Sequence, residues 1–378
     1  MGTLRSNKFL ELIYGSNKTP FYVYTPRWVD SSAGIKVLHY LCHSINTAGG
    51  MAFIVLSEGG HLGHPRINPA LDTPILSEEV AQSHFESGIT PVTIYSETVP
   101  GNPLDAPFVM RYLLNFTGAL GGQSNFESDE FIVAFSQSIA DHYCELTDVI
   151  TPVLFLPPVD PREVIPTTHK IQQQAVYAGK YRSFVGTPPS IGSLPSVEIF
   201  RDGPKMQSRT EVLKILGESS RVYLFENSSI ATEAILSGTP VHFVPNQFLG
   251  SVIAETELGN YGVALSDCNE DFQTAFETLS KAEDVYNDAV TEFPGKLKEI
   301  LEAATVSSRN ITYLQRINVP KHKHVVNSHR LNLAMQILRF QGFTVLARVM
   351  YHFVLRRLAW RFWRNKGKTM LRKSDRHE

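Results

Sequence analysis

The sequence has few cysteines and few charged residues for its length. Its 378 residues include three cysteines, Cys42, Cys144 and Cys268, and 19% of all residues are charged. An odd number of scattered cysteines, with no CxxC or other metal-ligand spacing, excludes a disulfide framework and a cysteine zinc site. With 43% hydrophobic residues, the chain has the composition of a folded protein, which excludes disorder as its main theme.

Long apolar segments are also missing. Nowhere do 18 or more apolar residues follow one another, because Arg339, Arg348, Arg356 and Arg357 interrupt the apolar C-terminal region. We therefore expect no membrane-spanning helix. Residues 1–16 lack the layout of a secretory signal, and the cysteines fit a reducing compartment, so the chain is expected to stay in the cytoplasm.

The net charge of −2 conceals an uneven distribution. Residues 339–378 contain eleven Lys/Arg and two acidic residues, a surplus of nine positive charges that leaves a deficit of eleven in the preceding residues. Apolar and aromatic side chains are interleaved with these arginines, which is typical of a helix at a membrane interface. The residues expected to contact an anionic membrane are Arg356, Arg357, Trp360, Arg361, Trp363 and Arg364.

Two alternatives remain for this tail. In one, the segment up to Leu346 packs on the N-terminal domain and the rest is a solubilising end. In the other, the tail binds nucleic acid, which is disfavoured because no nucleic-acid-binding module accompanies it.

Short apolar strands alternate with helical patterns through most of the chain. In the first half, strands are expected at residues 21–24, 51–56, 91–95, 131–135 and 153–156, and helices at 35–45, near 78–86 and around 109–113. Prolines at 157, 158 and 161 indicate a linker. Further strands are expected at 175–178, 197–200, 221–225 and 241–244, with helices after the S/T-x-x-E capping pattern at Ser208 and from Ile230.

A chain of this length is too long for one hydrophobic core. The alternation predicts an α/β fold of two Rossmann-like domains that face a central cleft, with ligands at the carboxyl ends of the strands. The expected boundaries are residues 1–165 and 166–325 for the two domains and residues 326–378 for C-terminal helices with the basic amphipathic tail.

The stretch from Phe225 to Val241 carries the sharpest chemical pattern. A strand delivers Glu226 and Asn227 at its carboxyl end, and Ser228 and Ser229 then open a helix whose free N–H groups suit a diphosphate. Glu233 lies about one turn into that helix, where a carboxylate can accept hydrogen bonds from sugar or ribose hydroxyls. Alternatively, the serines are simple N-caps and Glu233 is a favourable first-turn charge.

This stretch resembles the C-terminal domain of the GT-B glycosyltransferases, which include many lipopolysaccharide and capsule enzymes. Glu233-Ala234 and the Gly238–Val241 turn (GTPV) match the family's nucleotide-sugar site. The resemblance implies that Glu233 binds the donor ribose and that Glu226 faces the donor sugar. Glu226 and Glu233 enclose six residues, where the family's retaining motif has seven. The resemblance also assigns the acceptor to the N-terminal domain and the nucleotide-sugar to the C-terminal domain.

Two further segments strengthen the resemblance. Residues 175–182 (AVYAGKYR) look like the first strand and loop of the same domain. There Gly179 would allow close backbone approach to the donor phosphates, and Lys180 and Arg182 would neutralise the diphosphate leaving group. Residues 95–104 (YSETVPGNPL) and 109–115 (VMRYLLN) look like a signature of bacterial polysaccharide glycosyltransferases.

A base for the acceptor hydroxyl is expected from the N-terminal side of the cleft. Glu97, after the strand at 91–95, is the preferred candidate, and His61, after the strand at 51–56, is the second. Ser32, Gly34 and Asn102 are candidate acceptor-side loop residues. For each of them alone, the alternative is an ordinary loop or turn residue.

No metal or other cofactor is expected. The chain has no DxD triplet, and GT-B enzymes typically use basic residues and a helix end in place of a divalent cation. His322 and His324 form an H-x-H pair, but with no supporting cysteine or third ligand a solvated basic linker is favoured.

The resemblance therefore implies a glycosyltransferase, with a hexose as the expected sugar. It would move this sugar from a nucleotide-sugar donor to a lipid-linked or oligosaccharide acceptor in O-antigen or capsule biosynthesis. It would work peripherally on the inner face of the cell membrane, beside other glycan-assembly enzymes and without nucleic acid. The alternatives are a nucleotide-sugar epimerase and a non-catalytic glycan- or lipid-binding module, both of the same fold.

Overall fold

The computed structural model describes residues 19–320, apart from 58–62, 160, 162–163, 165–166, 168, 202, 247–248, 250–251 and 253–257. His61 and the basic tail, with its six predicted membrane contacts, lie outside the described residues. Within the described part of the chain, none of the helices combines the length and the apolar character needed to cross a bilayer.

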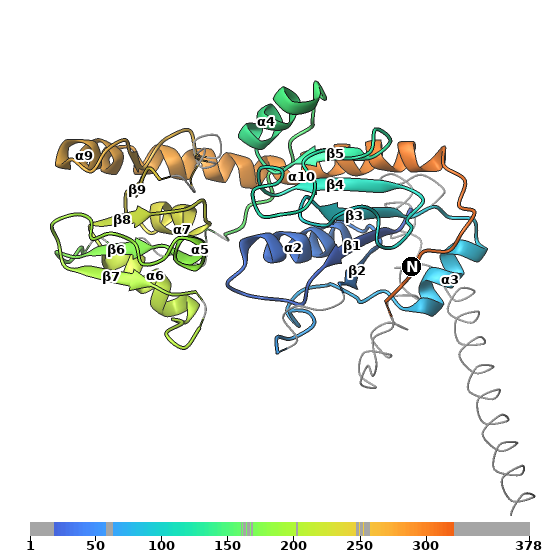
Figure 1. Cartoon of the computed structure of the whole chain (residues 1–378), viewed down its shortest axis with the longest axis horizontal. Helices are drawn as coiled ribbons and strands as arrows, with labels where there is room; N and C mark the ends of the chain where they lie inside the picture. The colour runs from blue at the N-terminus through green and yellow to red at the C-terminus, as the bar shows by residue number, and fades with distance from the viewer. Residues whose placement is uncertain are drawn as a thin grey trace, which may run out of the picture.

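The first domain is built on a five-stranded parallel sheet with the strand order β2-β1-β3-β4-β5 (Figure 1). Its elements are β1 (Phe21–Thr25), α2 (Ala33–Thr47), β2 (Ala52–Leu56), α3 (Glu78–Glu86), β3 (Val92–Ser96), β4 (Val109–Leu113), β5 (Phe131–Ala134) and α4 (Gln137–Thr147). Every residue of β2, β3 and β4 is buried, as expected of parallel strands that are covered on both faces.

The second domain repeats this arrangement. Its sheet is also parallel and has the order β10-β9-β8-β6-β7. Its elements are β6 (Gln174–Tyr177), α5 (Gly179–Phe184), β7 (Ser196–Ile199), α6 (Arg209–Glu218), β8 (Arg221–Leu224), α7 (Ile230–Leu236), β9 (Val241–Phe243), β10 (Val263–Ala264) and α9 (Asn269–Glu277).

Both sheets have the same doubly wound topology. Numbered within its own domain, each has the spatial order second, first, third, fourth and fifth strand. A cavity lies between the two domains. Two Rossmann-like α/β domains that face a cleft form the GT-B fold, so the predicted fold class is confirmed for the two domains.

The segment 109–113 is a strand, and the helix expected there is wrong. Val109, Tyr112 and Leu113 fit helical spacing, but all five residues of β4 are buried between β3 and β5. Arg111 is fully buried among them and pairs with Glu130, a partner that the local pattern does not reveal. Tertiary pairing therefore decides the conformation of this short segment.

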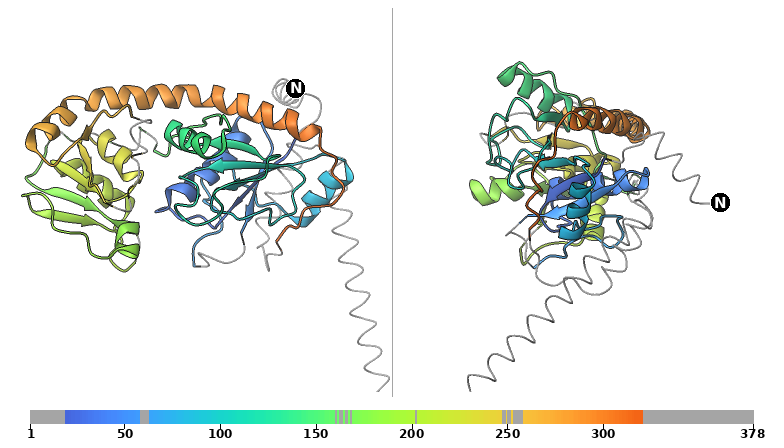
Figure 2. Two further views of the ribbon diagram at one scale, coloured as in Figure 1. Left: turned by 45° about the horizontal axis from the view of Figure 1, so that its top comes forward. Right: turned by 90° about the vertical axis from the view of Figure 1, so that its right-hand side faces the viewer.

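The long helix α10 (Leu279–Arg309) crosses from the second domain to the first (Figure 2). Tyr286 in its first half belongs to the core of the second domain, whereas Leu297 and Leu301 belong to the core of the first. Ile317 beyond the helix also packs on the first domain. The chain thus returns to the first domain before the boundary predicted at residue 325, because this amphipathic helix supplies an apolar stripe to each core.

The helix α6 begins with the predicted capping box. The Ser208 hydroxyl accepts a hydrogen bond of 3.2 Å from Glu211 N, and the Glu211 carboxylate accepts one of 2.7 Å from Ser208 N. We expect Ser208→Ala to lower the free energy of unfolding by about 1 kcal/mol, measured by urea denaturation. Ser280→Ala, in the exposed first turn of α10, is the control. Equal effects of the two changes would contradict the capping role.

Candidate active site

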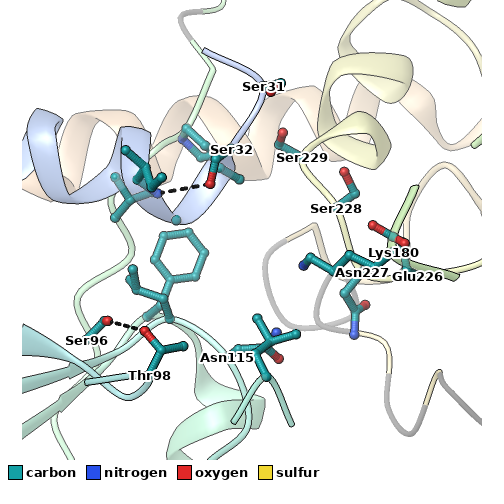
Figure 3. A pocket seen from close by; sticks show the side chains of 18 of the residues that line it. Ser31, Ser32, Ser96, Thr98, Asn115, Lys180, Glu226, Asn227, Ser228 and Ser229 are labelled. Carbon is teal, nitrogen blue, oxygen red and sulfur yellow. Dashed lines mark hydrogen bonds between the residues drawn. The ribbon is translucent and has the colours of Figure 1, made fainter. Parts of the chain in front are cut away.

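A cavity of about 310 Å³ lies between the two domains (Figure 3). The first domain lines it with residues that follow β1, β3 and β4 and with the start of α2, and the second with residues that follow β6 and β8 and with the start of α7. Parallel sheets collect ligands at these strand ends. The predicted site residues that line it are Ser32, Gly34, Glu97, Lys180, Glu226, Asn227, Ser228 and Ser229.

Glu97 comes directly after β3 and lies in the wall of the cavity, with 3% of the residue exposed. Leu114 N donates a hydrogen bond of 2.8 Å to Glu97 Oε2. Burial raises the pKa of Glu97 to about 7, against the opposing effects of this hydrogen bond and of the positive charges of Lys180 and Arg111. A carboxyl group with a pKa near neutrality can accept a proton at physiological pH, as a general base must.

Lys180 is the second residue of α5 and acts electrostatically on carboxylates of both domains. Its positive charge lowers the pKa of Glu97 and of Glu226. Glu226 is 3% exposed and accepts a hydrogen bond of 2.9 Å from Tyr181 N. Burial nevertheless raises the pKa of Glu226 above its ordinary value. A cation and two buried carboxyl groups therefore meet where the domains face each other.

The start of α2 faces the second domain across the cavity. Ser32 caps this 15-residue helix, and its hydroxyl accepts a hydrogen bond of 3.5 Å from Ile35 N. Ser31 and Ser32 lie opposite Ser228 and Ser229, which precede α7 (Figure 3). Because free N–H groups and the positive end of the dipole lie at a helix start, α2 makes this side of the cavity favourable for an anion.

Glu233, expected to bind the donor ribose, is absent from the cavity lining. Its carboxylate is fully buried, with Oε1 3.0 Å from Arg209 Nη1 and Oε2 3.9 Å from Arg201 Nη1. Arg201 also donates a hydrogen bond of 3.3 Å to Asp30 O in the first domain. In this conformation Glu233 is therefore the centre of an ion-pair network that joins the two domains.

Two further predicted residues have partners outside the cavity. Arg182 is not among the lining residues, and its guanidinium pairs with Glu198 of β7. Asn102, predicted on the acceptor side, accepts a hydrogen bond of 2.9 Å from Tyr95 Oη and donates one of 2.9 Å to Ala106 O. Asn102 thus closes the loop after β3, and Arg182 braces α5 against β7. Their assignment to the acceptor and to the donor stays a prediction.

Gly179 makes room for a tyrosine. A Cβ atom at Gly179 would lie 2.7 Å from Tyr177 Oη. Tyr177 lines the cavity, and a hydrogen bond from its side chain lowers the pKa of Glu226. Tyr177 could not be singled out from the sequence because it ends the buried strand β6, where an aromatic residue is ordinarily part of the core. Its position at a carboxyl end was the available signal.

The first-domain wall of the cavity carries most of its large apolar side chains. Ile35, Leu38, Leu114, Leu120 and Phe135 lie there beside polar residues, whereas polar side chains dominate the second-domain wall. These residues could not be singled out from the sequence, because apolar residues at a helix start or after a strand follow the same pattern as core residues. The two walls therefore present different chemistry to a ligand.

Within the described residues, no group of three or more His, Cys, Asp or Glu side chains is arranged to hold a metal ion. The acidic residues of the cavity are Glu97 and Glu226. Chemistry without a metal stays a prediction.

No protein-family model matches the chain, and no curated protein sequence matches it. Among solved structures, the glycosyltransferase SnogD from Streptomyces nogalater is similar over 77% of this chain and 100% of its own, with 14% identity and a TM-score of 0.41. WaaG, a glycosyltransferase involved in lipopolysaccharide biosynthesis, is similar over 75% and 99%, with 13% identity and a TM-score of 0.42. An α-glucosyltransferase in complex with UDP and a 13-mer DNA is similar over 78% and 100%, with 10% identity and a TM-score of 0.40. At these values the likenesses say nothing of the donor, acceptor or reaction of this chain.

Proposed function

We propose that the protein is a glycosyltransferase that moves a sugar, a hexose, from a nucleotide-sugar donor to a lipid-linked or oligosaccharide acceptor in O-antigen or capsule biosynthesis. The observation that carries this proposal is the meeting of Lys180 with Glu97 and Glu226 in the interdomain cavity. Glycosyl transfer needs a cation for the departing diphosphate, polar groups for the sugar and a base for the acceptor. These three residues supply one of each.

In the proposed reaction, the donor lies against the second domain with its diphosphate at Lys180 and its sugar near Glu226. Glu97 accepts the proton of the acceptor hydroxyl, whose oxygen bonds to the anomeric carbon while the bond from that carbon to the diphosphate oxygen breaks. Lys180 and the start of α2 stabilise the negative charge that develops on the diphosphate. The proposal assigns this task to the chain's own groups, without a metal or other cofactor.

The acceptor side of the proposal is supported by the apolar wall. Leu114, Leu120 and Phe135 lie on the same side of the cavity as Glu97 and suit an acceptor that carries apolar groups. A lipid-linked acceptor places the enzyme on the inner face of the cell membrane, as a peripheral cytoplasmic protein that works beside other glycan-assembly enzymes. The basic tail named above is the proposed membrane contact.

The donor part of the proposal is tested by calorimetric titration with UDP, GDP and dTDP. We expect one of them to bind the wild-type protein and Lys180→Ala to raise its Kd by about 10- to 100-fold, because a charge-assisted hydrogen bond contributes about 1.5–3 kcal/mol. Lys214→Ala is the matched control, since this lysine is 70% exposed on α6 of the same domain. The donor assignment fails if no diphosphate binds, or if the two variants bind equally well.

A further inference from the structure

The loop that carries Glu97, residues 96–101, is held in place by hydrogen bonds from a buried arginine, Arg111. Arg111 of β4 donates hydrogen bonds to three backbone carbonyls of this loop, those of Ser96 at 3.4 Å, Val99 at 2.7 Å and Gly101 at 3.0 Å. Arg111 is fully buried. A guanidinium that binds three carbonyl groups of one short loop restricts the conformations open to that loop.

The remaining donors of Arg111 are also satisfied. Its Nε and Nη2 groups donate to the two carboxylate oxygens of Glu130, at 2.8 and 2.7 Å. Its Cζ atom lies 4.6 Å from the ring centroid of Phe126 and 5.2 Å from that of Tyr95. All five N–H groups therefore have acceptors, and the guanidinium is held in one orientation.

The far end of the loop is closed by Tyr95. Its hydroxyl donates to Asn102 Oδ1 at 2.9 Å and accepts a hydrogen bond of 3.2 Å from Leu104 N. The residues of the signature at 95–104 and 109–115 thus hold the loop in place, and Glu97 is the acidic residue that this loop presents to the cavity.

The open side of the loop is covered by a turn that we call the glycine turn, residues 118–123. A Cβ atom at Gly122 would overlap the carbonyl oxygen of Glu97 and lie 3.1 Å from Thr98 Cα. Gln123 Oε1 accepts a hydrogen bond of 2.8 Å from Gly101 N. Leu120, in the same turn, is 39% exposed and lines the cavity.

We propose that the glycine turn is a positioning element for Glu97, with Gly122 as the residue that sets the place of its backbone and Leu120 as the contact with an apolar part of the acceptor. Arg111 fixes the loop on one side and Gly122 on the other. One turn thereby carries both Leu120, which contacts the acceptor, and Gly122, which sets the position of the base Glu97. This inference rests on the proposed function, because Glu97 is a base only if the protein transfers a sugar.

A matched pair of variants separates this contact from backbone strain. Gly121 and Gly122 both have φ of +86°, so alanine is strained at either position, but a Cβ atom at Gly121 meets nothing within 4 Å. We expect Gly122→Ala to lower kcat about 100-fold with little change in KM for the donor, because displacement of a catalytic group by about 1 Å has an effect of this size. Gly121→Ala, which carries the same strain without the contact, should lower kcat at least tenfold less than Gly122→Ala does.

Two further measurements extend the test: the first uses another variant, in case Gly122→Ala folds poorly, and the second does not need turnover. Gln123→Ala removes only the hydrogen bond to Gly101 N, and we expect it to lower kcat about fivefold. The second reports on Glu97 without turnover: the pH dependence of the unfolding free energy, compared with and without Glu97→Gln. Lys180 and Arg111 are the charged groups that act on Glu97, and neither is altered. We expect the part of this pH dependence that is due to Glu97 to move to a different pH in Gly122→Ala and to stay at the wild-type pH in Gly121→Ala.

The outcomes are distinct. If Gly122→Ala and Gly121→Ala share both kcat and pH dependence, the positioning role is wrong. If the wild-type protein neither binds a nucleoside diphosphate nor transfers a sugar, while Gly122→Ala still shifts the titration of Glu97, the proposed function fails and the contact that positions Glu97 stands.

Discussion

Glu97→Gln is expected to lower the rate of sugar transfer by about 10²- to 10⁴-fold, the usual contribution of a general base. Glutamine keeps the size of the side chain and an oxygen that can accept the hydrogen bond from Leu114 N, but it cannot take a proton. The wild-type rate should rise with pH through about 7, as Glu97 ionises, and the variant should lack this rise. Steady-state kinetics between pH 5.5 and 9 measure both effects.

The same change is expected to stabilise the protein at alkaline pH. Glu97 titrates near 4.5 when unfolded and at about 7 when folded, so the folded state binds more protons between these values. The contribution of Glu97 to the free energy of unfolding therefore falls as the pH rises from 4.5 to 7, and it stays constant above pH 7. Glu97→Gln should then be more stable than the wild type by roughly 3 kcal/mol at pH 8 and similar to it near pH 4.5.

The control for both effects is Glu283→Gln, since this glutamate is exposed on α10. It should change neither the rate of transfer nor the stability. A Glu97→Gln protein that transfers sugar at the wild-type rate would remove the base from the proposed mechanism. The difference in unfolding free energy between Glu97→Gln and the wild type should be larger at pH 8 than at pH 4.5. An equal difference at the two pH values would contradict the burial of Glu97.

Glu233→Ala is expected to lower the free energy of unfolding by about 3–5 kcal/mol, the usual effect of breaking a buried ion pair. The carboxylate is fully buried between Arg209 and Arg201, and its charge also acts on Lys36 of the first domain. Its removal leaves three cations close together, with Arg201 and Lys36 almost completely buried. Urea denaturation at pH 7.5 measures the loss.

Two variants sharpen this second prediction. Glu233→Gln keeps an oxygen that can accept the hydrogen bond from Arg209 and should lose less stability than Glu233→Ala. Glu277→Ala, at an exposed position of α9, should lose little. If Glu233→Ala lowers the free energy of unfolding by no more than about 1 kcal/mol, Glu233 is not the buried centre of the interdomain network.

The expected loss of stability in Glu233→Ala also limits which variant can test whether Glu233 binds the donor ribose. A simple expectation from the sequence is that Glu233→Ala removes donor-dependent turnover from a protein that stays folded. With the ion pair in place, lost turnover in this variant would not separate a ribose contact from loss of structure. Nucleotide titration of Glu233→Gln, with its stability measured in parallel, separates them.

Much of the fold could be predicted because its determinants are local. The buried strands at 21–24 and 51–56 are continuous apolar runs, and the capping box at Ser208 marks the start of α6 from four consecutive residues. Lys180 and Glu226 follow the neighbouring strands β6 and β8 of one sheet, and Glu97 follows β3 of the other. Their shared place in the cavity could be expected once the carboxyl edges of the two sheets face one cleft.

The rest depends on partners that lie far away in the sequence. Arg111 can be buried in β4 because Glu130 supplies its counter-charge, and Glu233 is closed off by Arg201 and Arg209. Arg182 turns from the cavity because Glu198 stands on the neighbouring strand. Such pairings leave no local sequence pattern. The importance of some of these side chains could therefore be predicted from the sequence, but their contacts could not.

Measuring both products of the proposed reaction at once tests glycosyl transfer most directly. The wild-type protein is incubated with hexose conjugates of UDP, GDP and dTDP and with a prenyl-diphosphate-linked N-acetylglucosamine in anionic vesicles, and mass spectrometry quantifies the free nucleoside diphosphate and the extended glycolipid. We predict equal amounts of the two with one donor, and neither above background with Glu97→Gln. A nucleotide-sugar that returns intact, or returns as its epimer with no extended glycolipid, would contradict glycosyl transfer.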